Sequence, residues 1–345
     1  MYPLDLVSIT QAGRSAGLTA CGVARCDPSG HAGYLDAWLA RGAHAGMAWM
    51  ERTAPARRDL RSHWPWAVSA LVGALSYLTE PLERRRLPGV ARHVSRYARG
   101  ADYHDILKQR LAAWAEELER LAGQPLRRVV LVDTSAVLER ELAARAGLGW
   151  FGKNTCLIGP TGDSWRFLGV VLTDAELPPS GPAPAERCGS CRACLDACPT
   201  GAIPEPWFVD ANRCISYLTI EHRGPVPREL HAGIGDWVFG CDVCQEVCPW
   251  NRRVDPVAEP AFAARAELEQ LTLAELARLD EAGFRERFRG TPLARPKRAG
   301  LVRNALIAGA NAGDAEVIEA ARHLVDDPDP TVRETARAVL SRGDR

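Results

Sequence analysis

The sequence predicts an α+β protein in three successive parts: a sheet-and-helix part, a cysteine-rich part and an all-helical part. Three observations support this order. Short apolar runs alternate with amphipathic segments up to about residue 180. Most of the cysteines then fall between residues 181 and 255, behind the Pro-rich linker LPPSGPAPAE. Beyond residue 255 the composition shifts to Ala, Leu, Glu and Arg with helical period.

The first part begins with helical patterning, and the stretch LTACGVARCD then predicts a strand. Another buried strand is expected near Val68 to Leu75. From about residue 98 an amphipathic helix is expected to run to Gly123, a glycine suited to a helix C-terminus. Arg57 and Arg58 precede the second strand and either bind an anion or cap a loop. The pattern alone favours the loop.

An acidic residue ends the next expected strand. Val129 to Val132 is a short apolar β-branched run, and Asp133 follows it directly before another helix. Folds that pack helices on sheets place reactive side chains at strand ends. Alternatively Asp133, Thr134 or Ser135 caps the following helix. The pattern does not choose between a reactive group and a cap.

The letters GLGWFG at 147–152 match a dinucleotide-binding pattern, but they follow a predicted helix. The dinucleotide fingerprint joins a strand to a helix, so nicotinamide binding is not expected here. The glycines instead allow close backbone approach to a flat ligand or a neighbouring element. The stretch KNTCLIGPTGDSWRFLGVVLT that follows predicts a hairpin or two strands.

The run CGSCRACLDACPT (188–200) has the C-x₂-C-x₂-C-x₃-C-P spacing of ferredoxin iron–sulfur motifs. In such runs the fourth cysteine crosses to a second cluster, so more cysteines are expected downstream, and they are present. Paired CxxC units also build zinc sites, but this run overfills a tetrahedral ion. We therefore expect a bacterial ferredoxin-like domain with two [4Fe-4S] clusters. The expected ligands are Cys188, Cys191, Cys194 and Cys248 for the first cluster, and Cys198, Cys214, Cys241 and Cys244 for the second.

The last part is expected to be helical. Thr272 and Glu275 form a capping-box pattern, and VRNALIAGA (302–310) and VRETARAVL (332–340) recur thirty residues apart. This recurrence predicts a short stack of HEAT-like repeats. Seven bases face a single acid between residues 285 and 303, which makes either a solvated helix face or a surface for nucleic-acid phosphates. These bases are Arg285, Arg287, Arg289, Arg295, Lys297, Arg298 and Arg303.

Composition limits the partners. The 345 residues contain 43 Lys and Arg and 43 Asp and Glu, so any nucleic acid must be bound through a local patch. The start of the chain does not resemble a signal peptide, and the stretch from Ala67 to Leu78 is too short to span a bilayer. Eleven cysteines fit metal binding in a reducing cytoplasm. Cys21, Cys26 and Cys156 are expected to be buried thiols.

Five strings together resemble the epoxyqueuosine reductase family: 97–111, 132–158, 188–203, 213–227 and 239–252. The similarity covers nearly the whole chain. It implies a cobalamin-binding catalytic domain (1–180), a ferredoxin-like domain (181–255) and a HEAT-like, tRNA-binding domain (256–345).

The resemblance implies an oxidoreductase that reduces epoxyqueuosine to queuosine, the last step of queuosine synthesis. Its partners would be the tRNAs for Asp, Asn, His and Tyr and an external donor such as flavodoxin or ferredoxin. Electrons would pass through the Cys198 cluster, then the Cys188 cluster, to cobalamin. The chain has no DxHxxG, so cobalamin would be held without a histidine below cobalt. The resemblance further implies that it is base-off and rests as cob(II)alamin. A cytoplasmic monomer without membrane contact is expected.

The resemblance also implies site residues. Asp133 would be the proton donor, if burial raises its pKa enough to hold a proton. The tRNA contacts would come from the basic stretch. Ser135-Ala136 and Asp163 depart from the usual family strings and put the loop geometry in doubt. The implied cobalamin contacts are Arg57, Tyr97, Asp133, Lys153, Asn154, Ser164, Ser216, Tyr217 and Asp242, and the implied tRNA contacts are Arg295, Lys297, Arg298 and Arg303.

Two other functions remain open at this point. Another corrinoid iron–sulfur reductase, such as a reductive dehalogenase, would share the clusters but has no use for a basic helical tail. A non-catalytic electron carrier would leave some 180 residues before the clusters without a role.

Overall fold

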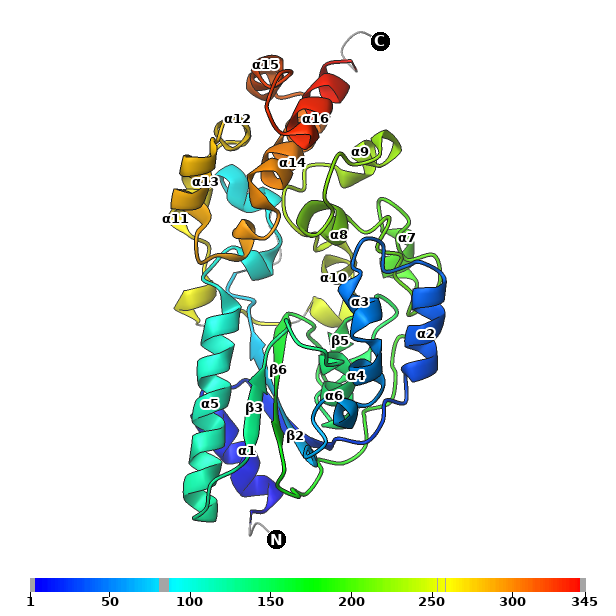
Figure 1. Ribbon diagram of the computed structural model, residues 1–345, viewed down its shortest axis with the longest axis vertical. Coiled ribbons are helices and arrows are strands. Elements are labelled where there is room, and N and C mark those ends of the chain that lie inside the picture. Colours follow the sequence, from blue (N-terminus) through cyan, green and yellow to red (C-terminus); the bar gives the residue numbers. More distant parts are fainter. Residues whose placement is uncertain (1–3, 81–86, 253, 258, 342–345) are drawn as a thin grey trace.

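The computed structural model describes residues 4–80, 87–252, 254–257 and 259–341. The molecule is elongated, with the sheet at one end, the C-terminal helices at the other, and the cysteine-rich part beside the junction (Figure 1). Within the described ranges, no helix combines the length and apolarity needed to cross a membrane.

The first part is built on an antiparallel four-stranded sheet in the order β1-β2-β6-β3. Its centre is apolar on both faces, because every residue of β2 is buried. The expected strands near residues 20, 70 and 130 are therefore confirmed. Of the two alternatives for the stretch after residue 152, two strands are confirmed and the hairpin is not, since β5 pairs with the preceding β4 and the long β6 enters the main sheet. The strands are β1 (Ala20–Arg25), β2 (Ser69–Ser76), β3 (Arg128–Leu131), β4 (Trp150–Phe151), β5 (Leu157–Ile158) and β6 (Arg166–Thr173).

Helices cover both faces of this sheet. On one face α1 (Leu6–Ser15) and α5 (Tyr103–Ala122) form a core with Leu71, Leu75 and Val171. On the other face α6 (Glu139–Arg145) packs over Val72 and Leu172. The predicted C-terminus of α5 is confirmed, because Gly123 follows it in the left-handed region at φ 66°. Smaller elements connect the sheet: α2 (Ala32–Ala40), α3 (Trp49–Arg52), α4 (Ala54–Arg58), η1 (Leu60–Ser62), η3 (Gly89–His93) and η4 (Arg96–Ala98).

The GLGWFG stretch follows α6 and enters β4, so the rejection of a dinucleotide fingerprint is supported. Close backbone approach explains one of its glycines. A Cβ on Gly149 would lie 2.2 Å from the carbonyl oxygen of Ile158 on the neighbouring strand β5. The neighbour is thus another element of the chain.

The cysteine-rich part consists of short helices around loops. Its core is formed by Leu218, Ile234 and Trp237, with Ile307 from the C-terminal part. Two CxxC units end in two packed short helices, with Cys194 in α7 and Cys244 in α10. The elements are α7 (Ala193–Asp196), α8 (Ile215–Ile220), α9 (Arg228–Ile234), α10 (Val243–Glu246) and η5 (Pro249–Asn251).

The C-terminal part is all helical, as predicted. The capping box at Thr272 and Glu275 is present and begins α12. The two recurring strings lie in α14 and α16, which pack against each other and against α15. Helix α14 is buried at every position from 300 to 309, which makes it the centre of this part. The elements are η6 (Pro260–Phe262), α11 (Ala266–Gln270), α12 (Leu273–Ala277), α13 (Glu281–Phe288), η7 (Pro292–Ala294), α14 (Lys297–Ala312), α15 (Ala315–His323) and α16 (Pro330–Leu340).

The parts are interleaved along the chain. Residues 89–98, which lie between β2 and α5, share a hydrophobic core with the C-terminal helices (Figure 1). Val90 donates its N–H to the carbonyl of Leu271 at 2.8 Å. In return Phe262 packs into the core of the first part. Contiguous ranges of sequence therefore describe the three parts only approximately.

Candidate active site at the junction of the three parts

Asp133 stands on a sharp turn directly after β3. Its backbone is left-handed at φ 57°, and its side chain is 63% exposed. A non-glycine residue in this region costs about 1–3 kcal/mol and persists only where its surroundings hold it. The capping alternative is wrong, because Leu138 precedes α6 and no side chain caps this helix. The strained position indicates a functional group.

Two side chains hold this turn. The N–H of Asp133 donates to Oε1 of Glu139 at 2.8 Å. Arg57 donates from its guanidinium to the carbonyls of Val137 at 2.7 Å and Ser135 at 3.2 Å. Arg57 thus fixes a loop, as the pattern favoured. Burial raises the pKa of Glu139 to about 7, with the charge of Asp133 as the second cause.

A histidine links Asp133 to a second carboxylate. His104 Nε2 lies 3.4 Å from Oδ2 of Asp133, and His104 Nδ1 lies 2.7 Å from Oδ1 of Asp102. These two carboxylates raise the pKa of His104 to about 9. In turn the contact with His104 lowers the pKa of Asp133. The expectation that burial raises the pKa of Asp133 is wrong, since the imidazole outweighs desolvation.

Sequence reasoning missed His104. His104 lies in the string DYHDIL (102–107) and is not among the predicted site residues. The aspartate two residues earlier was a usable signal. Asp102 is the N-cap of α5 and accepts the N–H of His104 at 3.0 Å. An N-cap carboxylate followed two residues later by histidine places both groups on one helix end.

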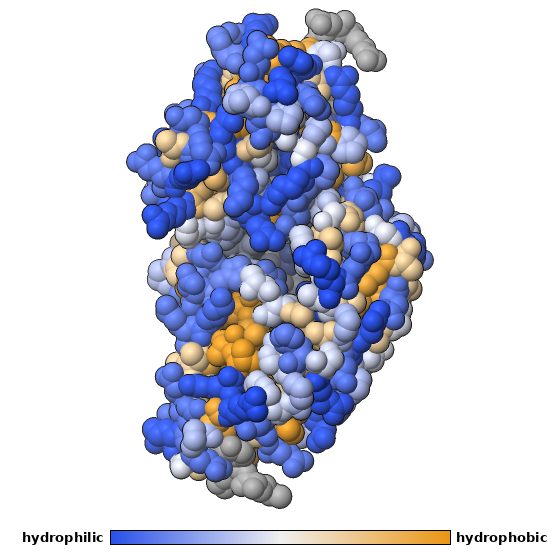
Figure 2. Space-filling view, viewed as in Figure 1, coloured by the Kyte–Doolittle hydropathy of each residue, from blue (hydrophilic) through white to orange (hydrophobic). Residues whose placement is uncertain are grey.

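Charged groups from the other two parts meet Asp133 here. The ring of Tyr97 packs against Phe239 and Tyr103, and burial followed by the charge of Asp133 raises the pKa of its hydroxyl. Arg295 is 54% exposed and pairs with Glu221 at 2.9 Å, and its charge also lowers the pKa of Asp133. Figure 2 shows a hollow in the middle of this face, between the sheet end and the helical end. Asp133 therefore lies where all three parts meet.

Cysteines within each predicted set are neighbours, and the assignment of ligands to the two clusters stays a prediction. Burial raises the pKa of Cys194 to about 11, and the neighbouring Cys248, Cys188 and Cys191 raise it further. Burial is the largest cause that raises the pKa of Cys241, followed by the charges of its neighbours Asp242, Cys214 and Cys198. Cys241 and Cys214 also lie beside Cys244. Trp150, whose indole N–H is buried without a partner among the described residues, packs against Cys248 and Cys188. An unpaired buried donor beside thiols fits an acceptor such as an iron–sulfur cluster.

Lys153 and Asn154 touch both groups of cysteines. Lys153 Nζ donates to the carbonyls of Gly189 at 2.5 Å and Cys191 at 2.9 Å, and its side chain is buried. Asn154 donates to the carbonyl of Cys244 at 3.1 Å. The turn between β4 and β5 therefore supports the backbone of both cysteine loops.

The other implied cofactor contacts also join the first part to the cysteine-rich part. Asp242 is 1% exposed and accepts hydrogen bonds from the hydroxyl of Ser95 and the N–H of Arg96. Ser164 accepts from Gln245 and Asn251 through its hydroxyl oxygen. Tyr217 accepts from the N–H of Gly46 at 2.8 Å, and Ser216 lies beside Cys214. These polar side-chain groups are thus already engaged by protein groups.

The structure changes the interpretation of the basic stretch at residues 285–303. Arg303 is fully buried, so a contact of its side chain with tRNA phosphate is wrong. It donates instead to the carbonyls of Leu218, His222 and Gly224 in the cysteine-rich part. Arg298 is also largely buried and pairs with Asp327 at 2.7 Å. Helical periodicity alone could not reveal this, because α14 is buried all round.

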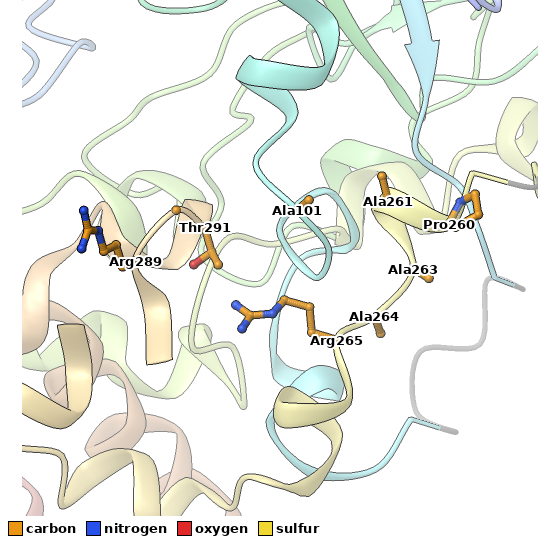
Figure 3. A pocket seen from close by; sticks show the side chains of 9 residues that line it. Ala101, Pro260, Ala261, Ala263, Ala264, Arg265, Arg289 and Thr291 are labelled. Carbon is orange, nitrogen blue, oxygen red and sulfur yellow. The ribbon is translucent and has the colours of Figure 1, made fainter. Parts of the chain in front are cut away.

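The remaining bases lie on the surface. Lys297 is exposed, as are Arg285, Arg287 and Arg289. A pocket of about 420 Å³ lies beside them (Figure 3). Arg289 and Arg265 reach it from opposite sides, and alanines line most of the rest. Of the seven bases between residues 285 and 303, Arg285, Arg287, Arg289, Arg295 and Lys297 are therefore the exposed ones.

The three other cysteines differ in burial. Cys26 is buried, as expected, but Cys21 and Cys156 are only partly buried. Cys156 adjoins Cys244 of the second group. The inserted Asp163 is buried, pairs with Arg166 at 2.7 Å and takes a left-handed φ of 84°.

Two family models match the chain. The model described as "4Fe-4S double cluster binding domain" matches residues 187–251. The model described as "Epoxyqueuosine reductase QueG, DUF1730" matches residues 57–134. The first covers both cysteine groups, and a protein with two [4Fe-4S] clusters is therefore supported over a zinc site.

Curated relatives extend the similarity to the whole chain. An epoxyqueuosine reductase from Xanthomonas campestris is 40% identical over 326 residues, covering 93% of this chain and 91% of the relative. One from Alicycliphilus denitrificans is 40% identical and covers 96% of both chains.

Solved structures share the fold. A crystal structure of epoxyqueuosine reductase with a tRNA-Tyr epoxyqueuosine-modified stem loop has a TM-score of 0.85 and 29% identity, over 96% of this chain and 88% of that chain. One from Bacillus subtilis, with its aspartate catalytic loop swung out of the active site, has a TM-score of 0.82 and 28% identity, over 94% and 87%. By its identity and coverage, this chain belongs to the epoxyqueuosine reductase family.

Proposed function

We propose that this protein reduces epoxyqueuosine to queuosine in tRNA, with Asp133 delivering a proton to the departing epoxide oxygen. The observation that carries the proposal is the exposed, strained Asp133 at the junction of the three parts. A solved relative binds an epoxyqueuosine-modified stem loop, and another moves an aspartate loop in its active site. Opening the epoxide and removing its oxygen consumes two electrons and two protons, so a positioned acid is needed.

The residues around Asp133 fit cobalamin only in part. Asp133 and Tyr97 lie close together and would hold the corrin, while Arg57 would act through the loop it fixes. The side chains of Lys153, Asn154, Ser164 and Asp242 are engaged in supporting the cysteine loops, so any contact from them would come from backbone groups. When bound, cobalamin supplies a low-potential cobalt centre, and the clusters supply electrons singly.

The exposed bases of the C-terminal part favour tRNA phosphates as partners. Arg295 stands nearest to Asp133, with its guanidinium 5.8 Å from the ring of Trp49. Lys297 and the exposed arginines of α13 extend the positive surface away from the site. We propose that these residues bind the anticodon stem-loop of the tRNAs for Asp, Asn, His and Tyr.

We also propose how the chain is divided into parts and how it receives electrons. The catalytic part would span 1–180, the two-cluster part 181–255 and a HEAT-like tRNA-binding part 256–345. The first cluster would use the Cys188 group and the second the Cys198 group. The protein would act as a cytoplasmic monomer that receives electrons from flavodoxin or ferredoxin.

The deciding experiment is mass analysis of tRNA nucleosides. The reconstituted protein is incubated with cobalamin, a chemical reductant and tRNA that carries epoxyqueuosine. Conversion to queuosine is expected, and Asp133→Asn should lower turnover by about 10²-fold or more while the cluster and cob(II)alamin spectra remain. A protein that shows only cluster absorption and leaves epoxyqueuosine unchanged is an electron carrier. Near-normal turnover of Asp133→Asn would remove Asp133 from the acid role.

A further inference from the structure

The proton-donating group of the site extends beyond Asp133. His104 lies between two carboxylates, with Nδ1 at 2.7 Å from Asp102 and Nε2 at 3.4 Å from Asp133. Asp102 also accepts the backbone N–H of His104, so the ring is fixed at the first turn of α5. The ring stacks on Tyr103 at 4.1 Å, and Tyr103 stacks on Phe167 at 4.1 Å. The imidazole is thus held with one nitrogen toward each acid.

An imidazole in this position holds a proton that Asp133 alone cannot. Asp102 accepts from Nδ1, while the buried Nε2 makes no hydrogen bond within the described residues and faces Oδ2 of Asp133 at 3.4 Å. The two negative charges favour imidazolium and raise the pKa of His104 to about 9. Asp133 keeps its charge, because its pKa is lowered by the same contact. Near neutral pH the proton of this pair therefore resides on His104.

Other charged groups surround the pair. Glu139 accepts the N–H of Asp133 on one side, and Arg57 holds the same loop. Arg295 contributes positive charge from the C-terminal part, and Tyr97 lies beneath Asp133. On α5 the neighbours are Tyr103 and Lys108. Among these, Glu139 also titrates near neutral pH, so its effect must be separated from that of His104.

We propose that His104 stores the proton that Asp133 delivers, and that substrate binding drives its transfer from Nε2 to Oδ2. The inference rests on the proposed function. Asp133 is 63% exposed without substrate. A bound base that excludes water disfavours the ion pair, because desolvation raises a carboxyl pKa and lowers an imidazolium pKa. The proton then moves to Asp133, where the neutral acid faces the epoxide oxygen.

The transfer balances in atoms and charge. As the carbon–oxygen bond of the epoxide breaks, its electron pair remains on oxygen as an alkoxide, and the carbon takes up the electrons that the reduction supplies. Asp133 gives to that oxygen the proton it received from His104. The products are an alcohol, a carboxylate at Asp133 and a neutral imidazole at His104. Water then returns one proton to Nε2 and restores the imidazolium.

The test is the pH dependence of kcat/KM for epoxyqueuosine reduction by the holoenzyme, between pH 6 and 10. The wild type is expected to be nearly flat up to about pH 9 and then to fall, because His104 loses its proton. In His104→Gln only Asp133 carries a proton, at a carboxyl pKa near 4, so kcat/KM should fall about tenfold per pH unit from pH 6 upward. At pH 8 the loss should be about 10²-fold or more.

Controls separate proton storage from structure. Asp105→Asn removes an exposed carboxylate from the same helical turn and should leave the profile unchanged. Asp102→Asn keeps the imidazole but removes one of the two negative charges that raise the pKa of His104. The fall of kcat/KM in this variant should therefore begin about one pH unit lower than in the wild type. Glu139→Gln should keep the fall near pH 9.

Several results would overturn the proposal while leaving the proposed function intact. A His104→Gln profile parallel to the wild type would assign His104 a structural role only. If the pH at which kcat/KM falls shifts in Glu139→Gln instead, the proton belongs to Glu139. If His104→Gln fails to bind tRNA or clusters, the Asp102→Asn profile decides alone, and an unshifted fall refutes the proposal. A wild type that converts no epoxyqueuosine contradicts the proposed function itself.

Discussion

Replacing Arg303 by methionine is expected to weaken the joint between the C-terminal helices and the cysteine-rich part. The guanidinium is buried and donates to three carbonyls, at 3.0 Å to His222, 2.7 Å to Gly224 and 2.6 Å to Leu218. Charge-assisted bonds contribute about 2 kcal/mol each, so about 6 kcal/mol is lost. Burial lowers the pKa of Arg303 well below its ordinary value, to about 10, which is an opposing cost of about 3 kcal/mol that methionine relieves.

The net loss is about 3 kcal/mol, because the three bonds outweigh the cost of burying the charge. At about 2–4 °C per kcal/mol, the thermal midpoint should fall by roughly 6–12 °C. Differential scanning fluorimetry of the cluster-loaded protein at one fixed scan rate measures this. The matched control is Lys297→Met, which lies exposed on the same helix and should leave the midpoint within about 1 °C. If Arg303→Met instead keeps the midpoint and reduces the salt dependence of tRNA binding, Arg303 contacts phosphate and the burial argument fails.

Three further outcomes are expected. Lys153→Met removes a positive charge beside the Cys188 loop and should lower the reduction potential of the first cluster. The shift is roughly 90 mV for an assumed separation of about 8 Å between charge and cluster and an effective dielectric constant of about 20. A redox titration followed by EPR that shows no shift would contradict this. The folded protein keeps the proton of Glu139 up to about pH 7, whereas the unfolded chain releases it near 4.5, so stability should decrease as pH rises from 5 to 7. Glu139→Gln should flatten that trend in melting curves, and an unchanged slope would refute the assignment. Arg295→Glu combined with Lys297→Glu should weaken tRNA binding and reduce the salt slope by about 1–2, whereas Arg322→Glu on α15 should not; equal slopes would leave this surface as solvated charge only.

The sequence allowed the cysteine groups and Asp133 to be predicted because their signals are local. Thiol spacing is set by the ligand geometry of clusters, and the crossing cysteine demanded a partner set downstream. The strand before Asp133 stands out as a short β-branched run. The strained turn, however, depends in part on Arg57, which donates to the carbonyl of Val137 from 80 residues earlier in the chain, so no local pattern distinguished a reactive aspartate from a cap.

The errors arose where a side chain is defined by distant partners. Arg303 belongs to a basic stretch in the sequence, yet its guanidinium is surrounded by carbonyls some 80 residues earlier in the chain. The pKa of Asp133 was expected to rise through burial, but His104, 29 residues before it, reverses the direction. Both effects require tertiary structure, because charge and periodicity along the chain do not specify which groups meet.

The interleaving of residues 89–98 with the C-terminal helices has a consequence for synthesis. Val90 and Val94 pack in a core whose other members include Leu301 and Ala305. On a ribosome that adds about 5–20 residues per second, this segment waits roughly 10–40 s for those partners to be made. During that time apolar side chains of the nascent chain remain uncovered, and the sheet cannot close over its final neighbours. Cluster assembly machinery therefore has a window in which the cysteine loops are accessible before the last helices seal the joint.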